Sequence, residues 1–302
     1  MRRNGNSRHG TQRWLCCRCG RSFGWKNPLN KHLRQRVWFE RWIIEGYTLR
    51  QLATHSGHSL STLRRVIEYW LQHPPPRPLE LSAHRYLIFD GTFLEQRRGV
   101  FVAMDAERFA VIYGTPDSSE GPSDLAQFCG ALVEHALTPT GATIDGNPHL
   151  VRILRVLWPH IVIQRCLVHI QRQGLSWCRQ FPKRTEAKHL RTIFLQVMSI
   201  HTASDRIRFL SQVETWERRY GNRIARSKET GWVFSDLKRA RSMLLAALPD
   251  MFRYLDDPCI AKSTNALEGY FARLKHKYRQ HRGLARRHRD AYFRWYLHLC
   301  PR

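Results

Sequence analysis

Three carboxylates stand where a charged side chain needs a compensating cation. Asp90 ends the apolar run Tyr86–Phe89 and is followed by a Gly-Thr turn. Such a run is typical of a buried strand, where an unpaired charge costs several kcal/mol. Asp145 follows a second apolar segment, and Glu268 lies early in a predicted helix. Because carboxylate oxygens are the ligands that hard divalent cations prefer, the pattern predicts one metal site built from Asp90, Asp145 and Glu268.

Glu268 also has an interpretation that needs no metal. Asn265 is a good helix N-cap, and Glu268 follows three residues later, which is the spacing of a capping box. A capping glutamate folds back onto the start of its helix, whereas a metal ligand faces the two aspartates. The position of the Glu268 carboxylate therefore distinguishes the two interpretations.

Basic residues follow Glu268 along the same predicted helix. Lys275 is seven residues beyond Glu268 on the same helix face, and Arg279 continues that face. Together with Arg273, these side chains are expected to hold the DNA backbone while the carboxylates hold the cation. This is the pattern that a metal-dependent phosphodiester site requires.

A second metal-like pattern lies near the start of the chain, where Cys16 and Cys19 form a C-x-x-C knuckle typical of half a zinc ribbon. A two-Cys two-His finger is excluded, because the position four residues after His32 is Arg36. Three interpretations stay open: a ribbon whose first cysteine pair is lost or lies before the given start, an irregular Zn²⁺ site completed by Cys17 and a histidine, and plain buried or free cysteines.

The segment Tyr47–Leu71 has the spacing of a helix-turn-helix. Leu49, Leu52 and Ala53 make a short amphipathic helix, Gly57 sits in the turn, and a second apolar stripe consists of Leu60, Leu63, Val66, Ile67 and Trp70. Ser59 or Ser61 can cap the second helix. The side chains offered to a DNA major groove are then Ser61, Thr62, Arg64 and Arg65. The alternative is an ordinary helical hairpin with a solvated basic face.

The charge of the chain favours nucleic acid as its partner. Fifty Lys and Arg residues stand against 24 Asp and Glu residues, a net charge of +26. The positive charge is spread through the chain, as tracking a phosphate backbone requires. We expect no membrane partner, since no apolar window of membrane-spanning length and no signal peptide is visible. A cytoplasmic place is therefore expected. Eight cysteines are too few for a disulfide scaffold.

The order of predicted elements indicates an α/β catalytic domain. The prolines of His73–Pro78 predict a stiff linker over residues 74–83, after a partial ribbon over 1–30 and a helix-turn-helix domain over 31–73. Beyond the linker, strands are expected at 86–93, 99–104, 108–113, 142–144 and 160–166. Helices are expected at 124–137 and after Asp145, and a turn-rich loop at 116–122. This is the order of a ribonuclease-H-like fold over residues 84–302, with an all-helical insertion at about 170–255. In that topology the first and fourth strands are parallel neighbours, so Asp90 and Asp145 would lie within reach of one cation.

In these segments the chain resembles bacterial insertion-sequence transposases of the Mutator-like superfamily, which carry a DDE triad on a ribonuclease-H-like fold. The resemblance spans roughly residues 86–299. It rests on FDGTF at 89–93, IDGNPHL at 144–150, QRCLVH at 164–169, STNALEG at 263–269 and HRGL at 281–284.

The resemblance implies roles for particular residues. Asp90, Asp145 and Glu268 correspond to the metal-binding triad, which would hold two Mg²⁺ or Mn²⁺ ions about 3.5–4 Å apart. Cys166 and His169 correspond to the C-x-x-H signature of the family. For that pair, packing of the fifth strand against the next helix and metal binding both stay open. The ribbon and the helix-turn-helix resemble modules that recognise transposon ends.

The activity implied by the resemblance is DNA transposition. Water would free a 3′ hydroxyl at the end of the element, and that hydroxyl would attack target DNA. The partners would be double-stranded DNA, as inverted repeats and as target, bound by a dimer or larger assembly near a bacterial nucleoid. Two other functions stay open: a helix-turn-helix regulator with an inert catalytic domain, and a ribonuclease-H-like nuclease or resolvase without strand transfer.

Overall fold

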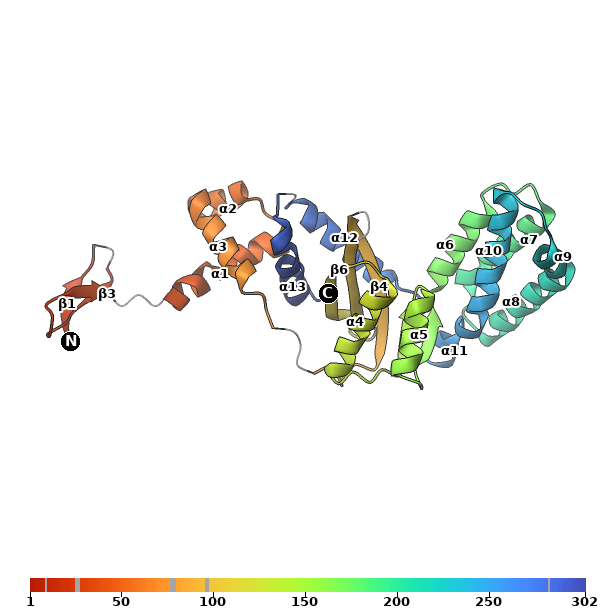
Figure 1. Ribbon diagram of the computed structural model, residues 1–302, viewed down its shortest axis with the longest axis horizontal. Helices are drawn as coiled ribbons and strands as arrows, with labels where there is room; N and C mark the ends of the chain where they lie inside the picture. Colours follow the sequence, from red (N-terminus) through yellow and green to blue (C-terminus); the bar gives the residue numbers. More distant parts are fainter. Residues whose placement is uncertain (9, 25–27, 77–79, 96–97, 282) are drawn as a thin grey trace. The chain divides into compact units, whose positions relative to one another are not determined.

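The computed structural model describes residues 1–8, 10–24, 28–76, 80–95, 98–281 and 283–302. The chain divides into two compact units, Met1–His73 and Pro74–Arg302 (Figure 1). The division falls in the proline-rich segment, where consecutive prolines forbid a continuous helix. Each unit is described by itself below.

The chain begins with a small antiparallel sheet of β1 (Arg2–Asn6), β2 (Gln12–Leu15) and β3 (Ser22–Gly24). The cysteine knuckle joins β2 to β3. The Gly20 amide donates to the Cys16 carbonyl in the turn, and Gly20 has a φ of 68°, which glycine adopts without strain. Because Arg2 pairs with Leu15, the N-terminal end of β1 lies beside the knuckle.

Three helices follow: α1 (Pro28–Ile44), α2 (Leu49–Ser56) and α3 (Leu60–Gln72). Thr48 and Gln51 form a capping box at the start of α2, and Gly57 ends that helix in the left-handed conformation. Ser59 caps α3, in agreement with one of the two predicted caps. Leu63, Val66, Ile67 and Trp70 are buried as expected, but Leu60 is 38 % exposed. Leu60 is the first residue of α3, one turn before the buried residues of this helix begin at Leu63.

A five-stranded sheet forms the centre of the second unit. Its strands are β4 (Tyr86–Glu95), β5 (Arg98–Asp105), β6 (Ala110–Ser118), β7 (Gly141–Ile144) and β8 (Val162–Arg165), in the order β6-β5-β4-β7-β8. The first three strands are antiparallel, and β7 is parallel to both β4 and β8. The predicted parallel pairing of the first and fourth strands is confirmed.

The third strand is longer than the sequence indicates. β6 runs through Pro116 to Ser118, where a turn-rich loop was expected. Proline is tolerated there because β6 is the edge strand of the sheet, so its missing N–H leaves no central ladder bond unmade. The pairing of β5 with β6 shifts register between Gly99 and Val100, next to this proline. The prediction of a loop was therefore wrong for residues 116–118.

Helices cover both faces of the sheet. On one face α4 (Pro122–Glu134) and α5 (Pro148–Leu157) share an apolar core with Leu87, Phe89 and Ile144. On the other face α12 (Asn265–Arg279) packs against β4, and α13 (Arg289–Leu299) packs against β6 after the short helix η4 (Arg286–His288). Successive strand residues point to opposite faces, so Ile88 and Asp90 face the side of α12.

An all-helical insertion separates β8 from α12, and Figure 1 shows its helices gathered into one bundle. The elements are α6 (Leu167–Cys178), α7 (Thr185–Gln196), η1 (Val197–Ser199), α8 (Ala203–Trp216), η2 (Glu217–Gly221), α9 (Asn222–Arg226), α10 (Trp232–Ala247), η3 (Leu248–Asp250) and α11 (Arg253–Asp256). These helices bury a core of their own around Phe194, Trp216 and Phe234. Two amide contacts of the buried Gln164, to the Met251 carbonyl and the Tyr254 amide, hold the end of the insertion against β8.

Within the described ranges, no helix combines the length and the apolar character needed to cross a bilayer.

Candidate active site

Asp90 and Asp145 lie at the same level of neighbouring strands. The parallel register pairs Tyr86 with Gly141 and Ile88 with Thr143. Continued by two residues, this register places Asp90 beside Asp145. Both aspartates also share a face of the sheet, since Asp90 alternates with Phe89, and Asp145 with Ile144, whose side chains lie in the core on the opposite face. Adjacent strands are about 4.8 Å apart, so the two carboxylates converge.

The electrostatics of Asp90 reflect this placement. Burial raises the pKa of the Asp90 carboxyl to about 6, and the negative charge of Asp145 acts in the same direction. The charge of His169, the Gly91 amide and the Thr264 hydroxyl oppose the rise. The Gly91 N–H donates to Asp90 Oδ1 at 2.9 Å. Burial therefore disfavours the charged form of Asp90, and a bound cation would favour that form.

Glu120 is a third acid of this site that the sequence analysis missed. Burial raises the pKa of Glu120 to about 7, and the charges of Asp145 and Asp90 add to the effect. A Cβ atom placed on Gly91 would lie 2.1 Å from Glu120 Oε1, so the carboxylate occupies the space that this glycine leaves. Glu120 has a φ of 56°, which is uncommon for a residue other than glycine. Only the fold brings it here, because the loop after β6 carries no motif that singles it out.

The loop after Asp145 is built around a glycine. Gly146 has a φ of 101°, and a Cβ atom there would lie 1.8 Å from Nη2 of Arg165. Arg165 Nη2 approaches the Asp145 carbonyl at 3.5 Å. The backbone N–H of Asn147 donates to Asp145 Oδ1 at 2.9 Å, and the side chain of Asn147 caps α5. The backbone of the segment IDGN thus holds Oδ1 of Asp145 in place, and Oδ2 is the oxygen left to bind a ligand.

Replacing Gly146 by alanine is expected to disturb both stability and the position of Asp145. An L-residue is strained at this φ, and Arg165 is largely enclosed, so the cost should be roughly 1–3 kcal/mol in the free energy of unfolding. Urea denaturation measures it. Gly130 lies in α4 with open space around it, so Gly130→Ala should change the free energy of unfolding by less than about 1 kcal/mol. Equal stability of the two variants would contradict this account of Gly146.

The segment before α12 crosses the ends of β7 and β8. The Thr143 hydroxyl donates to the Ala261 carbonyl at 2.5 Å, and the Leu167 amide donates to the Lys262 carbonyl at 3.1 Å. Thr264 is fully buried, and its amide approaches Cys166 Sγ at 3.3 Å. Thr264, rather than the expected Asn265, is the N-cap residue of α12. Its hydroxyl faces Cys166 and His169 instead of capping the helix.

Cys166 and His169 form a hydrogen-bonded pair between α6 and α12. The hydrogen bond to Cys166 raises the pKa of His169 to about 9, burial opposes this rise, and the charges of Cys166, Asp90 and Asp145 add to it. Burial acts to raise the pKa of Cys166, but the hydrogen bond and charge of His169 outweigh it, so the pKa of the thiol is lowered. His169 therefore supplies positive charge facing the two aspartates. Strand packing and metal binding both stay predictions for this pair.

Glu268 makes a contact that neither interpretation anticipated. Arg172 of α6 holds both of its oxygens, with Nη1 to Oε1 at 3.0 Å and Nη2 to Oε2 at 3.2 Å. No side-chain cap is formed at the start of α12, so Glu268 is not the partner in a capping box. The charge of Asp90 contributes to the raised pKa of Arg172, after the larger effect of Glu268. The charge of Arg172 is thus felt strongly by Glu268 and weakly by Asp90.

The basic residues predicted on α12 lie on its accessible side. Arg273 and Arg279 are exposed and Lys275 is half-buried. Arg273 lies over the ring of Tyr270 at 5.8 Å. Within the described residues these three side chains form no ion pair with an acid. They are accessible to a phosphate backbone.

The predicted residues of the first unit are accessible too. Ser61, Arg64 and Arg65 are exposed on α3, and Thr62 is half-buried against the Ser59 hydroxyl at 3.0 Å. Cys19 is exposed and Cys16 half-buried, so these two do not behave as plain buried cysteines. Hydrogen bonds from the amides of Cys19 and Arg18 lower the pKa of the Cys16 thiol.

Within the described residues, no further side chain joins Cys16 and Cys19 in a group that could hold a metal ion. The exposed Cys17 remains a free thiol beside the knuckle. His9, the histidine upstream of the knuckle, lies outside the described residues. His32 is stacked on Tyr69, with ring centroids 3.6 Å apart.

The donor set of the acidic site fits a hard divalent cation in chemistry, because Asp90 and Asp145 supply converging carboxylate oxygens. The arrangement is incomplete, however. In the part of the chain that the structure describes, no three His, Cys, Asp or Glu side chains are grouped closely enough to hold an ion. Arg172 holds the expected third carboxylate, Glu268. Completion of the site thus requires either rotation of Glu268 away from Arg172 or use of Glu120.

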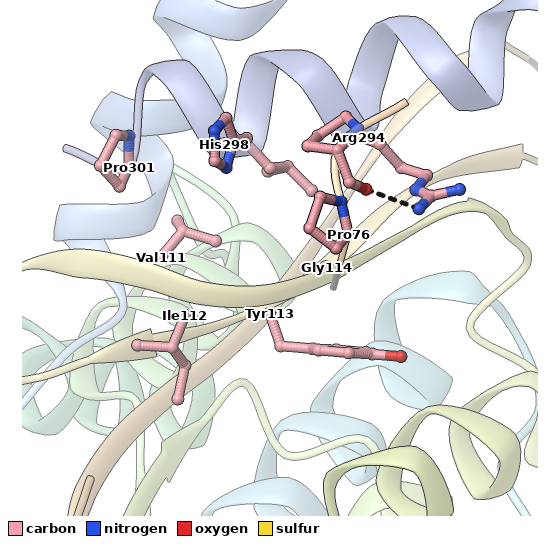
Figure 2. A pocket seen from close by; sticks show the side chains of 10 residues that line it. Pro76, Val111, Ile112, Tyr113, Gly114, Arg294, His298 and Pro301 are labelled. Carbon is pink, nitrogen blue, oxygen red and sulfur yellow. Dashed lines mark hydrogen bonds between the residues drawn. The ribbon is translucent and has the colours of Figure 1, made fainter. Parts of the chain in front are cut away.

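A cavity of about 450 Å³ lies elsewhere, between the edge strand β6 and α13 (Figure 2). Val111 and Tyr113 line one side, and His298 and Arg294 line the other. Figure 2 shows the hydrogen bond in which Arg294 holds the proline segment, with Nη2 2.7 Å from the Pro75 carbonyl oxygen. None of the candidate acids lines this cavity.

Stability without added metal should depend on pH through Asp90. The ordinary carboxyl pKa of 3.8 is raised to about 6 in the folded protein. The folded state therefore binds the proton more tightly, and its contribution to stability is fully present below pH 4 and lost as pH rises through 6. Asp90→Asn removes this loss, so we expect the variant to be more stable than the native chain at pH 7.5 by about 1–3 kcal/mol and equal to it near pH 4.

Denaturation in the presence of a chelator measures this difference. Glu134 is exposed on α4, so Glu134→Gln is the control and should show no such pH-dependent gain. A native chain that is at least as stable as Asp90→Asn at pH 7.5 would contradict the burial of a destabilising charge.

The chain matches no protein-family model and no curated protein.

Proposed function

We propose that the chain is a DDE-type transposase that cleaves DNA at transposon ends and joins the freed 3′ hydroxyl to target DNA. The observation that carries the proposal is the pair Asp90 and Asp145, set in register on parallel neighbouring strands. The strand order β6-β5-β4-β7-β8, with three antiparallel strands followed by two parallel ones, supports a ribonuclease-H-like fold. The helical insertion between β8 and α12 and the net charge of +26 support a transposase in particular.

In this proposal Asp90, Asp145 and Glu268 would hold two Mg²⁺ ions, which would supply charge neutralisation at the reacting phosphate and activation of water. The chain contributes the positions. The Gly91 amide orients one oxygen of Asp90, and the Asn147 amide orients one oxygen of Asp145. Lys275, Arg273 and Arg279 hold the backbone on either side of the scissile phosphate. No side-chain nucleophile is assigned, because water and then the 3′ hydroxyl can attack directly.

The experiment uses DNA that flanks the coding region, in which inverted repeats bounded by a short direct duplication are expected. Duplexes ending in these repeats are incubated with the protein, Mg²⁺ and a target plasmid. The expected products are nicked ends and end–target joints, both abolished by chelation. Cleavage of uncut ends without joining of pre-cut ends would identify a nuclease or resolvase. DNA binding without either reaction would identify a regulator.

The helix-turn-helix should contribute to DNA binding through charge. Arg64 and Arg65 are exposed on α3, and each phosphate contact that is lost should reduce the slope of log K against log salt by about 0.9. We therefore expect Arg64→Ala and Arg65→Ala each to weaken binding of the terminal repeat and to flatten its salt dependence. Fluorescence anisotropy across a salt series measures this.

Arg218 provides the control for this prediction. Its side chain is 72 % exposed on the helical insertion, so Arg218→Ala removes a charge outside the helix-turn-helix. Unchanged slopes in Arg64→Ala and Arg65→Ala would exclude α3 as a DNA contact.

A further inference from the structure

One end of the helical insertion exposes two aromatic rings. Phe181 lies in the loop between α6 and α7 and is 83 % exposed, and Trp232 begins α10 and is 82 % exposed. Rings of this size bury 150–250 Å² when covered, so leaving both in water is costly. The core beneath them does not use them, since Phe234 fills the adjacent buried position.

The two rings belong to the same surface. Arg179, two residues before Phe181, forms an ion pair with Asp236 of α10 at 2.9 Å. Arg184, three residues after Phe181, forms an ion pair with Glu229, three residues before Trp232. Arg184 also lies over the ring of Phe234 at 5.0 Å. These bridges hold the loop of Phe181 against the loop of Trp232.

The charge of this surface is positive. Arginine neutralises the acids that belong to it: Arg239 shares Asp236, and Arg223 and Arg184 share Glu186. Lys183 lies two residues after Phe181, Arg226 and Lys228 lie in the segment before Trp232, and all three are exposed. Among the residues that the structure describes, none of these three cations forms an ion pair. The surface therefore pairs two uncovered rings with uncompensated cations.

We propose that this aromatic–cationic surface binds unpaired bases of DNA. Trp232 and Phe181 stack on bases, while Lys183, Lys228 and Arg226 hold the adjoining phosphates. The proposal rests on DNA as the substrate in the proposed function. It adds a site, distant in sequence from the acids, that selects DNA whose terminal bases have lost their pairing, as beside a strand break.

Charge favours DNA over a second copy of the chain as the occupant. A second copy would bring a net charge of +26 to a surface that is already positive, so association through this surface would work against repulsion. Nucleic acid brings the opposite charge together with flat aromatic faces. The bases inside an intact duplex are already stacked on each other. The exposed side chains of Phe181 and Trp232 therefore fit bases that lie outside the duplex stack.

The test compares a blunt duplex with the same duplex carrying a four-nucleotide single-stranded overhang that contains 2-aminopurine. The native chain should bind the overhang DNA about tenfold more tightly than the blunt duplex, with quenched 2-aminopurine fluorescence. Trp232→Ala should lose this preference and the quenching, with blunt-duplex affinity within about twofold, and Phe181→Ala should act in the same direction. Trp232→Phe should retain most of the preference.

Ile207 provides the matched control, since it is 66 % exposed on α8 of the same insertion. Ile207→Ala should change neither affinity. Unchanged preference and quenching in both aromatic variants and in the double variant would overturn the proposal. Conversion of an oligomer to a monomer by Trp232→Ala in sedimentation velocity, with DNA binding unchanged, would overturn it in favour of a self-association surface.

Its failure can be told apart from failure of the proposed function. Asp90→Asn should lose cleavage and keep the preference for overhang DNA. If the native chain cleaves DNA without preferring overhang DNA, only the proposed base-binding surface is overturned. If it prefers overhang DNA but does not cleave, only the proposed transposase activity is overturned.

Discussion

Asp90→Asn should reduce Mg²⁺-dependent cleavage of terminal-repeat DNA by about 10³-fold while changing DNA affinity by less than about threefold. The amide keeps the size of the side chain and removes the charge that would hold the cation. Asp145→Asn should have the same effect, because both carboxylates stand at one level of β4 and β7. Single-turnover cleavage measures the first quantity, and fluorescence anisotropy measures the second.

The control is Glu134→Gln, an exposed acid on α4, which should cleave at the native rate. Circular dichroism of the variants separates loss of chemistry from loss of fold. Cleavage that persists in both Asp90→Asn and Asp145→Asn would remove this pair from the reaction and with it the proposed function.

The second large effect concerns Glu268 and its partner Arg172. If Glu268 completes the metal site, Glu268→Gln should reduce cleavage by about 10²-fold or more. Arg172→Ala should lower the Mg²⁺ concentration at half-maximal cleavage several-fold, because the carboxylate no longer has to leave a bidentate ion pair. A magnesium titration of the cleavage rate measures both.

Arg206→Ala is the control for removal of an ion pair, since Arg206 binds Asp256 at 3.0 Å at the end of the insertion. It should leave the magnesium requirement unchanged. Cleavage by Glu268→Gln at the native rate would exclude Glu268 as a ligand. Loss of cleavage in Glu120→Gln would then assign the third carboxylate to Glu120.

Only the first of these two acids could be found by reading the sequence. Glu268 lies in a recognisable segment, STNALEG, at the start of a predictable helix. Glu120 lies in the loop DSSEG, where serine, glycine and glutamate are ordinary surface residues. Its burial against Gly91 arises because β6 extends past Pro116 and carries the following loop to Gly91 of β4, a contact between positions nearly thirty residues apart.

The sequence by itself determined the strand carrying Asp90, the strand before Asp145, the helix-turn-helix and the all-helical character of the insertion. These follow from local hydrophobic period, turn residues and proline, which act over a few neighbouring residues. It also indicated that the two aspartates meet, because the order of elements restricts how short strands can pair.

The tertiary structure alone decided which charges surround the acids. Arg172 reaches Glu268 across 96 residues, and Thr264 reaches Cys166 across 98. Such contacts depend on how α6 and α12 pack at the end of the sheet, which no local pattern records. The rings of Phe181 and Trp232 illustrate the same limit, since aromatic residues of the insertion are expected in its core, and only the fold shows that these two are exposed.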